Sequence, residues 1–176
     1  MSCLVFNATP LVHFARAGTL DVLERLTDGR RRVTTQAVME EVLGAAERQP
    51  CRDDVRATPW LERVRVDGLA ELRAFAEYVK VLGSGVRDLG EASVLAWAEV
   101  HGAIAIVDDQ VAKRRGNSRG VQVHGTLWLI FEGYKHGLLD QGAVKGLIGR
   151  LEDTQQWFPC TADEAFDWAK GEGLLN

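Results

Sequence analysis

The sequence AIAIVDDQVAKRRG, residues 103–116, decides the fold class. Its five apolar residues are typical of a buried strand, and Asp108 and Asp109 follow them directly. Two acids at the end of a core strand indicate a site, because open α/β sheets bind ligands beyond the carboxyl ends of their strands. The stretch therefore predicts a parallel sheet and the edge of that sheet at which a site lies.

Strand-like and helical segments alternate along the rest of the chain. Short apolar or alternating runs at 3–7, 31–35, 63–67 and 120–125 predict further strands. Helical spacing of apolar residues predicts helices at 19–27, 36–48 and 69–82. Another helix should begin after the Gly-rich link 83–90 and end at Gly102. From Thr126 onward the pattern is helical, with a break near 157–161. The first helix should have Thr9 as N-cap, Pro10 at its first position and Gly18 at its end.

Strands separated by helices are typical of βαβ units, so we expect a three-layer α/β/α sandwich with a mainly parallel central sheet. A length of 176 residues with 46% apolar and 26% charged residues suits one domain. No Pro-, Gly- or Ser-rich linker divides the chain. We therefore predict one domain over residues 1–176, with the C-terminal helices, about 140–176, capping it.

Charge, cysteine content and the lengths of apolar runs bear on which partners and which cellular location the protein should have. A net charge of −4 argues against a surface that is basic throughout, and leaves two local basic runs, Arg30–Arg32 and Lys113–Arg115, as phosphate contacts or solvated surface. Cys3, Cys51 and Cys160 lack metal-binding spacing and should be reduced thiols. No apolar run approaches the ~20 residues of a membrane span and no leader pattern is seen, which predicts a cytoplasmic protein without a membrane partner.

Two further acids lie on apolar helix faces. Glu91 precedes Val94 and Leu95 at helical spacing, and Glu41 is similarly placed among small and apolar residues. A buried carboxylate costs several kcal/mol unless it is paired or bound to a metal. Buried ion pairs could compensate Glu41 and Glu91, and Asp108 and Asp109 could cap the helix 110–116. A divalent cation would instead account for all four acids and Asn7 together, and oxygen ligands favour Mg²⁺ or Mn²⁺.

Five blocks in their order resemble the PIN-domain family, in particular its VapC-like toxin ribonuclease branch. They are VFNATPLVHFARAGTLDVL (5–23), AVMEEV (37–42), LGEASVLAWAEVHGA (89–103), IVDDQVAKRRG (106–116) and GVQVHGTLWLI (120–130). The resemblance covers about residues 3–160. It implies a compact α/β/α nuclease that binds one or two Mg²⁺ or Mn²⁺ ions through clustered acids and cuts RNA as an endoribonuclease.

The resemblance also assigns roles. It implies that Asn7, Glu41, Glu91, Asp108 and Asp109 are the catalytic positions and metal ligands, with Asp88 as a residue that could share the role of Glu91. Thr9 stands where the family has a small hydroxyl residue close to the first acid, and we expect it to bind substrate. If bound metal activates water for phosphodiester hydrolysis, Lys113, Arg114 and Arg115 would grip the phosphates, and Arg119 could extend that track.

Residue 7 departs from the family pattern, which has aspartate where this chain has Asn7. An amide offers a neutral oxygen and removes one negative charge from the site. A weakened or inactive member, a site that relies on its other acids, and an engineered substitution all fit this residue. The alternative function is a non-catalytic PIN-like module that binds RNA or protein. A receiver-like phosphoacceptor fits less well, because the first strand ends in Asn7 and the last lacks the following lysine.

Two partners follow from these patterns. Toxin-like members of the family pair with a small antitoxin protein, so the resemblance implies such a partner. The helices that carry Trp97 and Trp128 also hold many other apolar residues, among them Leu127, Ile130, Phe131 and Tyr134, a surplus that suits a homodimer.

Overall fold

The computed structural model describes residues 2–44 and 50–175. Its strands are β1 (Cys3–Phe6), β2 (Arg31–Thr35), β3 (Glu62–Val64), β4 (Ile104–Ile106) and β5 (Val123–His124). Its helices are α1 (Ala8–Arg16), α2 (Leu20–Leu26), α3 (Gln36–Gly44), α4 (Pro50–Ala57), α5 (Leu69–Leu82), α6 (Val86–His101), α7 (Gln110–Ser118), α8 (Thr126–Lys135), α9 (Gln141–Asp153) and α10 (Ala165–Gly171).

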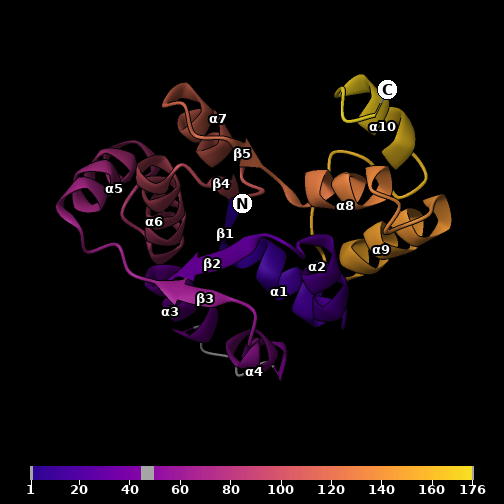
Figure 1. Ribbon diagram of the computed structural model, residues 1–176, viewed down its shortest axis with the longest axis horizontal. Coiled ribbons are helices and arrows are strands. Elements are labelled where there is room, and N and C mark those ends of the chain that lie inside the picture. The colour runs from indigo at the N-terminus through magenta and orange to yellow at the C-terminus, as the bar shows by residue number, and fades with distance from the viewer. Residues whose placement is uncertain (1, 45–49, 176) are drawn as a thin grey trace.

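The five strands form one sheet in the order β3-β2-β1-β4-β5, and every pair is parallel. The central sheet has α5 and α6 on one side and α1, α2, α8 and α9 on the other (Figure 1). The predicted three-layer α/β/α sandwich is therefore confirmed, with a sheet that is wholly rather than mainly parallel. Strand order reverses between β1 and β4, which places the expected ligand crevice beyond Phe6 and Ile106.

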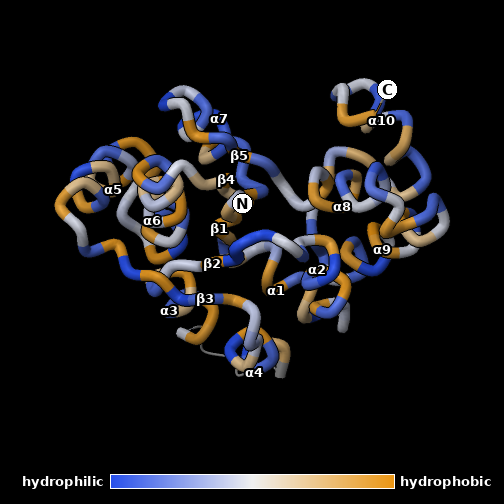
Figure 2. Tube along the Cα trace, in the orientation of Figure 1, coloured by the Kyte–Doolittle hydropathy of each residue, from blue (hydrophilic) through white to orange (hydrophobic). Residues whose placement is uncertain are grey.

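Apolar side chains of β1 and β4 form the centre of the core. Leu4, Val5 and Phe6 are fully buried, and the tube is orange through β1 and blue at the start of β2 (Figure 2). The buried Ile148 of α9 and Ala165 of α10 belong to the same apolar cluster. This packing supports the proposal that the C-terminal helices cap the same domain.

Several predicted element boundaries are wrong. α1 begins at Ala8 with Asn7 in the cap position, so Thr9 is not the N-cap, and Pro10 is third in the helix, where its missing N–H still costs nothing. α6 begins at Val86, inside the predicted link. α4 was not predicted, and α8 to α10 have an additional break after Lys135. The end of the predicted helix 36–48, residues 45–48, lies outside the described residues.

The apolar face of α8 is used within the chain. Ile130 and Phe131 are fully buried, and the ring of Phe166 packs edge-on against Phe131 and Tyr134. Part of the apolar surplus that suggested a homodimer, the rings of Phe131 and Tyr134, is thus covered by α10. Within the described residues, no helix is both long enough and apolar enough to cross a membrane.

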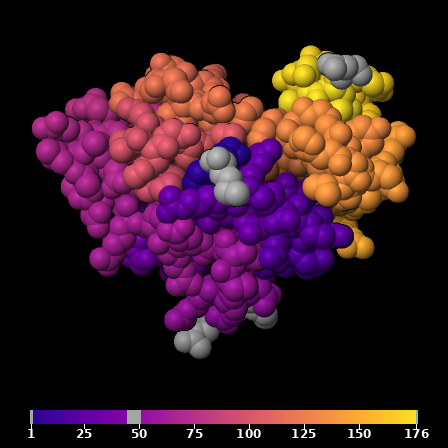
Figure 3. All heavy atoms as spheres, in the orientation of Figure 1, coloured from indigo at the N-terminus to yellow at the C-terminus, as the bar shows by residue number. Residues whose placement is uncertain are grey.

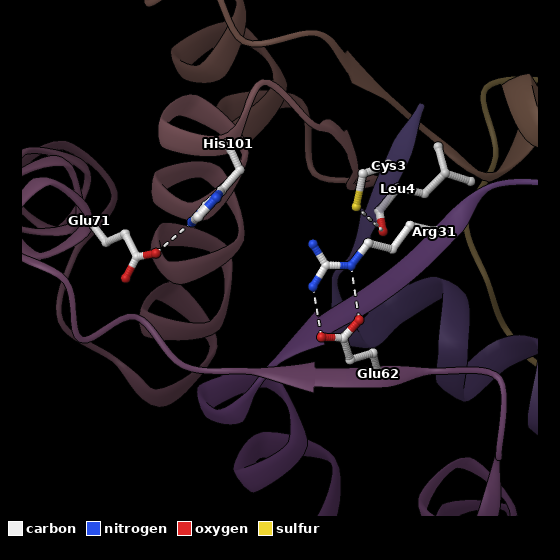
Figure 4. A network of polar contacts seen from close by, with 6 residues as sticks. All are labelled: Cys3, Leu4, Arg31, Glu62, Glu71 and His101. Atoms are coloured by element: carbon white, nitrogen blue, oxygen red, sulfur yellow. Dashed lines mark hydrogen bonds and ion pairs between the residues drawn. The ribbon is translucent and has the colours of Figure 1, made fainter. Parts of the chain in front are cut away.

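The first basic run, Arg30–Arg32 at the amino-terminal end of β2, packs against three tryptophan rings. Arg30, Arg31 and Arg32 lie over the rings of Trp128, Trp97 and Trp60, at 5.5, 5.6 and 5.2 Å from the ring centres. Arg31 also donates two hydrogen bonds to Glu62 at 2.9 and 2.7 Å (Figure 4). These contacts give the run a structural role, since the guanidinium planes cover indole rings.

Candidate active site

A cleft of about 620 Å³ opens beyond the ends of β1 and β4. Thr9 of α1, Glu41 of α3, Arg87 of α6 and the Asp108–Asp109 pair line it. The segment after α9, residues 155–157, closes one side. The cleft therefore gathers residues from across the sequence at the point where strand order reverses.

Asn7 is fixed by the sheet and turned inward. Its backbone N–H donates to the Ile106 carbonyl at 3.0 Å, which continues the β1–β4 pairing by one residue. The residue is only 2% exposed, and its side-chain Oδ1 receives no hydrogen bond from any described residue. A buried amide oxygen without a donor is costly, so this atom indicates a missing ligand.

Glu41 and Glu91 approach the same place from two helices. Glu41 Oε2 and Glu91 Oε1 are buried and, like Asn7 Oδ1, accept no hydrogen bond within the described chain. A Cβ atom added to Gly90 would lie 2.5 Å from Glu41 Oε2 and 3.7 Å from Asn7 Oδ1. Glycine at position 90 therefore lets α6 pass close to both oxygens, and places Glu91 beside them.

The electrostatic setting of these carboxyls is unfavourable without a cation. Burial raises the pKa of Glu41 to about 7, and the nearby guanidinium of Arg87 only partly offsets it. Burial, followed by repulsion from Asp109, raises the pKa of Glu91 to about 7 as well. Near neutral pH each carboxyl is therefore protonated for a large part of the time, and a bound cation would favour the ionised form.

Asp108 and Asp109 have different contacts. Asp109 Oδ1 caps α7 by accepting from the N–H groups of Val111 and Ala112 at 2.8 and 2.9 Å, and its Oδ2 lies 3.8 Å from Arg87 Nη2. Asp109 is thus a helix cap that keeps one oxygen toward the cleft.

Asp108 is held by the start of α8 and by the segment after α9. Its Oδ1 accepts from the Thr126 N–H at 2.8 Å, and its Oδ2 accepts from Thr126 Oγ1 at 2.7 Å and Gln156 Nε2 at 3.0 Å. Both oxygens are engaged, so Asp108 is better placed to contact a metal through water than directly.

The donor set fits a hard divalent cation. Three buried oxygens that accept no hydrogen bond, from Asn7, Glu41 and Glu91, lie near one another behind the cleft wall formed by Glu41 and Asp109. Glu91 Oε1 faces the Arg87 guanidinium at 3.5 Å. No three His, Cys, Asp or Glu side chains in residues 2–44 and 50–175 are grouped closely enough to hold a metal on their own. A cation here would therefore need the Asn7 amide oxygen and bound water, which Mg²⁺ retains readily.

The structure brings only part of the predicted basic run to the site. Lys113 lies beside Asp108, because a Cβ at Gly125 would be 2.6 Å from Lys113 Nζ and 2.7 Å from Asp108 Oδ1. Arg114 and Arg115 are exposed and do not line the cleft. Arg119 donates to Glu99 at 2.8 and 2.7 Å and lies over Tyr78, so it does not extend a phosphate track.

Two arginines in the cleft were missed from the sequence. Arg87 Nε lies 3.5 Å from Glu91 Oε1, and Arg52 of α4 donates to the Val42 carbonyl. The i,i+4 spacing of Arg87 and Glu91 was a usable signal, whereas nothing in the sequence joins Arg52 to the acids. Asp88 accepts from the Gly85 N–H at 3.2 Å, so it caps α6 and does not line the cleft beside Glu91.

A family model described as DUF3368, PIN domain, matches residues 3–164. Among solved structures, the chain is similar to VapBC2 from Rickettsia felis bound to a DNA fragment from their promoter, with a TM-score of 0.51 and 10% identity over 70% of this chain and 98% of that one. At that identity the likeness concerns the fold. No curated protein matches the chain.

Proposed function

The chain belongs to the PIN-domain family, as its motifs predict, and we propose that it is a metal-dependent endoribonuclease of this type. The observation that carries the proposal is the convergence of three buried oxygens that accept no hydrogen bond, from Asn7, Glu41 and Glu91, the last of which faces Arg87 at 3.5 Å. Such atoms are costly in a folded protein unless a ligand satisfies them. Their position beyond β1 and β4 is also where this sheet topology binds ligands.

Each side chain then has a role in phosphodiester hydrolysis. Glu41, Glu91 and Asp109 would hold Mg²⁺ or Mn²⁺ directly, Asn7 would supply a neutral oxygen, and Asp108 would act through water. The bound ion supplies a water of lowered pKa and positive charge opposite the phosphate.

Cationic side chains at the cleft would bind the RNA backbone. Arg87 and Arg52 line the cleft and can neutralise the phosphate at the cut, and Lys113 can contact the next one. Thr9, in the first turn of α1, lies in the cleft wall within reach of the same phosphates. Arg114 and Arg115 would contribute only to the more distant part of an RNA chain.

We further propose that the protein is the toxin of a toxin–antitoxin pair in the cytoplasm. The structural neighbour is a VapBC2 assembly, which supports a small antitoxin protein as partner. A homodimer belongs to the same proposal. Its interface would draw on exposed apolar side chains such as Val100 of α6 and Leu138 after α8.

A second candidate is a non-catalytic PIN module that binds RNA or protein. Asn7 favours it, because the neutral amide weakens the electrostatic attraction for a cation. The two candidates differ in one property, which is whether the remaining acids bind metal tightly enough to support cleavage.

Calorimetric titration with Mn²⁺ tests both candidates, using the protein as it stands and the Asn7→Asp variant. RNA cleavage is assayed in parallel at fixed salt. Asn117→Asp is the matched control, since it adds the same charge on the exposed end of α7.

Three results are informative. Binding and cleavage by the unchanged protein would establish that the remaining acids suffice. Binding and cleavage only after Asn7→Asp would identify residue 7 as the position that disables a nuclease. If neither protein binds Mn²⁺ or cuts RNA, the nuclease proposal fails and the non-catalytic candidate stands.

A further inference from the structure

The cleft continues past Asp108 into a second cavity of about 210 Å³. Asp108, Gln110 and Trp157 line both cavities, so the two are contiguous. The space-filling view shows the outline of the molecule dipping between α7 and the yellow α10, the elements on either side of this cavity (Figure 3). Its wall is rich in aromatic side chains: Trp128, Trp157, Phe158 and Trp168.

Trp157 is the most conspicuous member of this wall. It is 71% exposed, the highest value among the exposed large apolar side chains of the described residues. The segment that carries it is nevertheless fixed. Gln156 is buried and donates to Asp108 at 3.0 Å and to Thr126 Oγ1 at 3.2 Å. Cys160, three residues after Trp157, is also buried.

The backbone before Trp157 supports the same view. Gln155 has φ +66°, the one positive φ among the described non-glycine residues. This conformation is unfavourable for a side chain with a Cβ and turns the chain sharply between α9 and Gln156. The indole is thus held at the mouth of both cavities by a defined turn.

Charge next to the aromatic wall indicates the kind of ligand. Lys113 lines the second cavity, and its Nζ lies next to Asp108 at the boundary with the first cavity. An exposed aromatic ring beside a cation matches an unpaired nucleotide, whose base stacks while its phosphate is neutralised. A cavity of about 210 Å³ is smaller than a drug-sized pocket, which starts at roughly 300 Å³, and suits a single base.

We propose that the second cavity is a base-binding subsite for single-stranded RNA. The base next to the scissile phosphate stacks on Trp157, and Lys113 contacts the phosphate between the two cavities. This inference rests on the proposed ribonuclease function and adds to it the side chains that would hold the base next to the cut.

Fluorescence anisotropy in EDTA, at fixed salt, measures RNA binding without cleavage. The probes are a labelled 12-nucleotide oligouridine, an abasic oligonucleotide of the same length and charge, and a duplex of the same length. The variants are Trp157→Ala, Trp157→Phe and Lys113→Ala. Leu69→Ala is the control, because it removes another exposed apolar side chain on α5, away from both cavities.

Trp157→Ala should weaken oligouridine binding roughly ten- to hundredfold, the range expected for loss of one base–aromatic stack. Trp157→Phe should retain most of the affinity. The abasic oligonucleotide should bind the unchanged protein weakly and should be insensitive to Trp157→Ala. Lys113→Ala should weaken oligouridine and abasic binding to the same extent, and Leu69→Ala should change neither.

The outcomes separate this inference from the proposed function. If the unchanged protein binds oligouridine and Trp157→Ala binds it equally well, the subsite is refuted and the ribonuclease proposal is untouched. If Trp157→Ala loses a protein partner but not RNA, the aromatic wall is a protein interface and the inference is also refuted. If the unchanged protein binds none of the three probes, both proposals fail.

Discussion

Replacing Glu91 with glutamine should stabilise the metal-free protein at alkaline pH. Glu91 is 4% exposed, and its Oε1 accepts no hydrogen bond from the described residues. The ionised carboxylate is therefore held in an unfavourable environment. Glutamine has nearly the same shape and mimics the protonated acid, so it relieves the cost without opening a cavity.

The sign and size follow from the pKa of Glu91, which rises from an ordinary value of 4.5 to about 7 on folding. Below pH 4.5 the carboxyl is protonated in both states and costs nothing. As the pH rises from 4.5 to 7, the unfolded chain ionises first and the folded protein loses stability. A difference of about 2.5 between the two pKa values corresponds to about 3 kcal/mol at pH 8, or roughly 6 to 12 °C in Tm for a chain of this size.

Thermal unfolding followed by circular dichroism in EDTA, at pH 4, 6 and 8, measures this effect. The unchanged protein should lose stability between pH 4 and 8 relative to Glu91→Gln, and the two should have similar Tm values at pH 4. Glu40→Gln is the matched control, because the Glu40 carboxylate on α3 is exposed and accepts a hydrogen bond from Gln36. Added Mn²⁺ at 100 times its Kd should then stabilise the unchanged protein by about 2.7 kcal/mol and Glu91→Gln much less.

A Glu91→Gln protein that is less stable at pH 8 would refute this reasoning. It would mean that the Glu91–Arg87 pair, with its 3.5 Å separation, stabilises the fold more than burial of the carboxylate destabilises it. Equal stabilisation of both proteins by Mn²⁺ would place the bound metal elsewhere.

Three other predictions concern single positions. Gly90→Ala should weaken Mn²⁺ binding at least tenfold in calorimetry because its Cβ collides with a glutamate oxygen, whereas Gly146→Ala, with open space around it, should leave binding intact; equal affinities would refute the close approach. Glu71→Gln should lower the free energy of unfolding by about 1 to 2 kcal/mol at pH 7 in urea, because the hydrogen bond from His101 lowers the pKa of Glu71 (Figure 4). This stabilisation is present above the ordinary pKa of a glutamate and is lost as the pH falls through the lowered pKa of Glu71. A difference in stability that does not depend on pH would contradict the assignment. Arg31→Ala should lower Tm but leave the salt dependence of RNA affinity unchanged, because this guanidinium is held by carboxylate and indole; a shallower salt dependence would show a phosphate contact.

The sequence predicted those parts of the site that periodicity can reveal. Asp108 and Asp109 follow an apolar strand, and Glu91 begins an apolar helical stripe, so each stood out locally. The structure places all three at the same end of the sheet. Helix boundaries were less predictable, because the Asn7 side chain at the start of α1 makes no capping hydrogen bond and the cap residue of α6 is Gly85, which has no side chain to signal a cap.

Long-range contacts were not readable from the sequence. Gln156 binds Asp108 across 48 positions, and Arg52 enters the cleft from a short helix that holds few apolar residues. The two basic runs show the same limit. Charge alone could not distinguish Arg31, which is held by Glu62, from Lys113, which lies at the cleft.

The hydrogen bond from Gln156 to Asp108 also has a consequence for biosynthesis. A ribosome makes the chain from its amino terminus, so Asn7, Glu41, Glu91 and the Asp108–Asp109 pair all emerge before Gln156 and Trp157. Until that segment has been translated, Asp108 lacks one of its donors and the cleft lacks one wall. The site therefore stays incomplete through most of the chain's own synthesis.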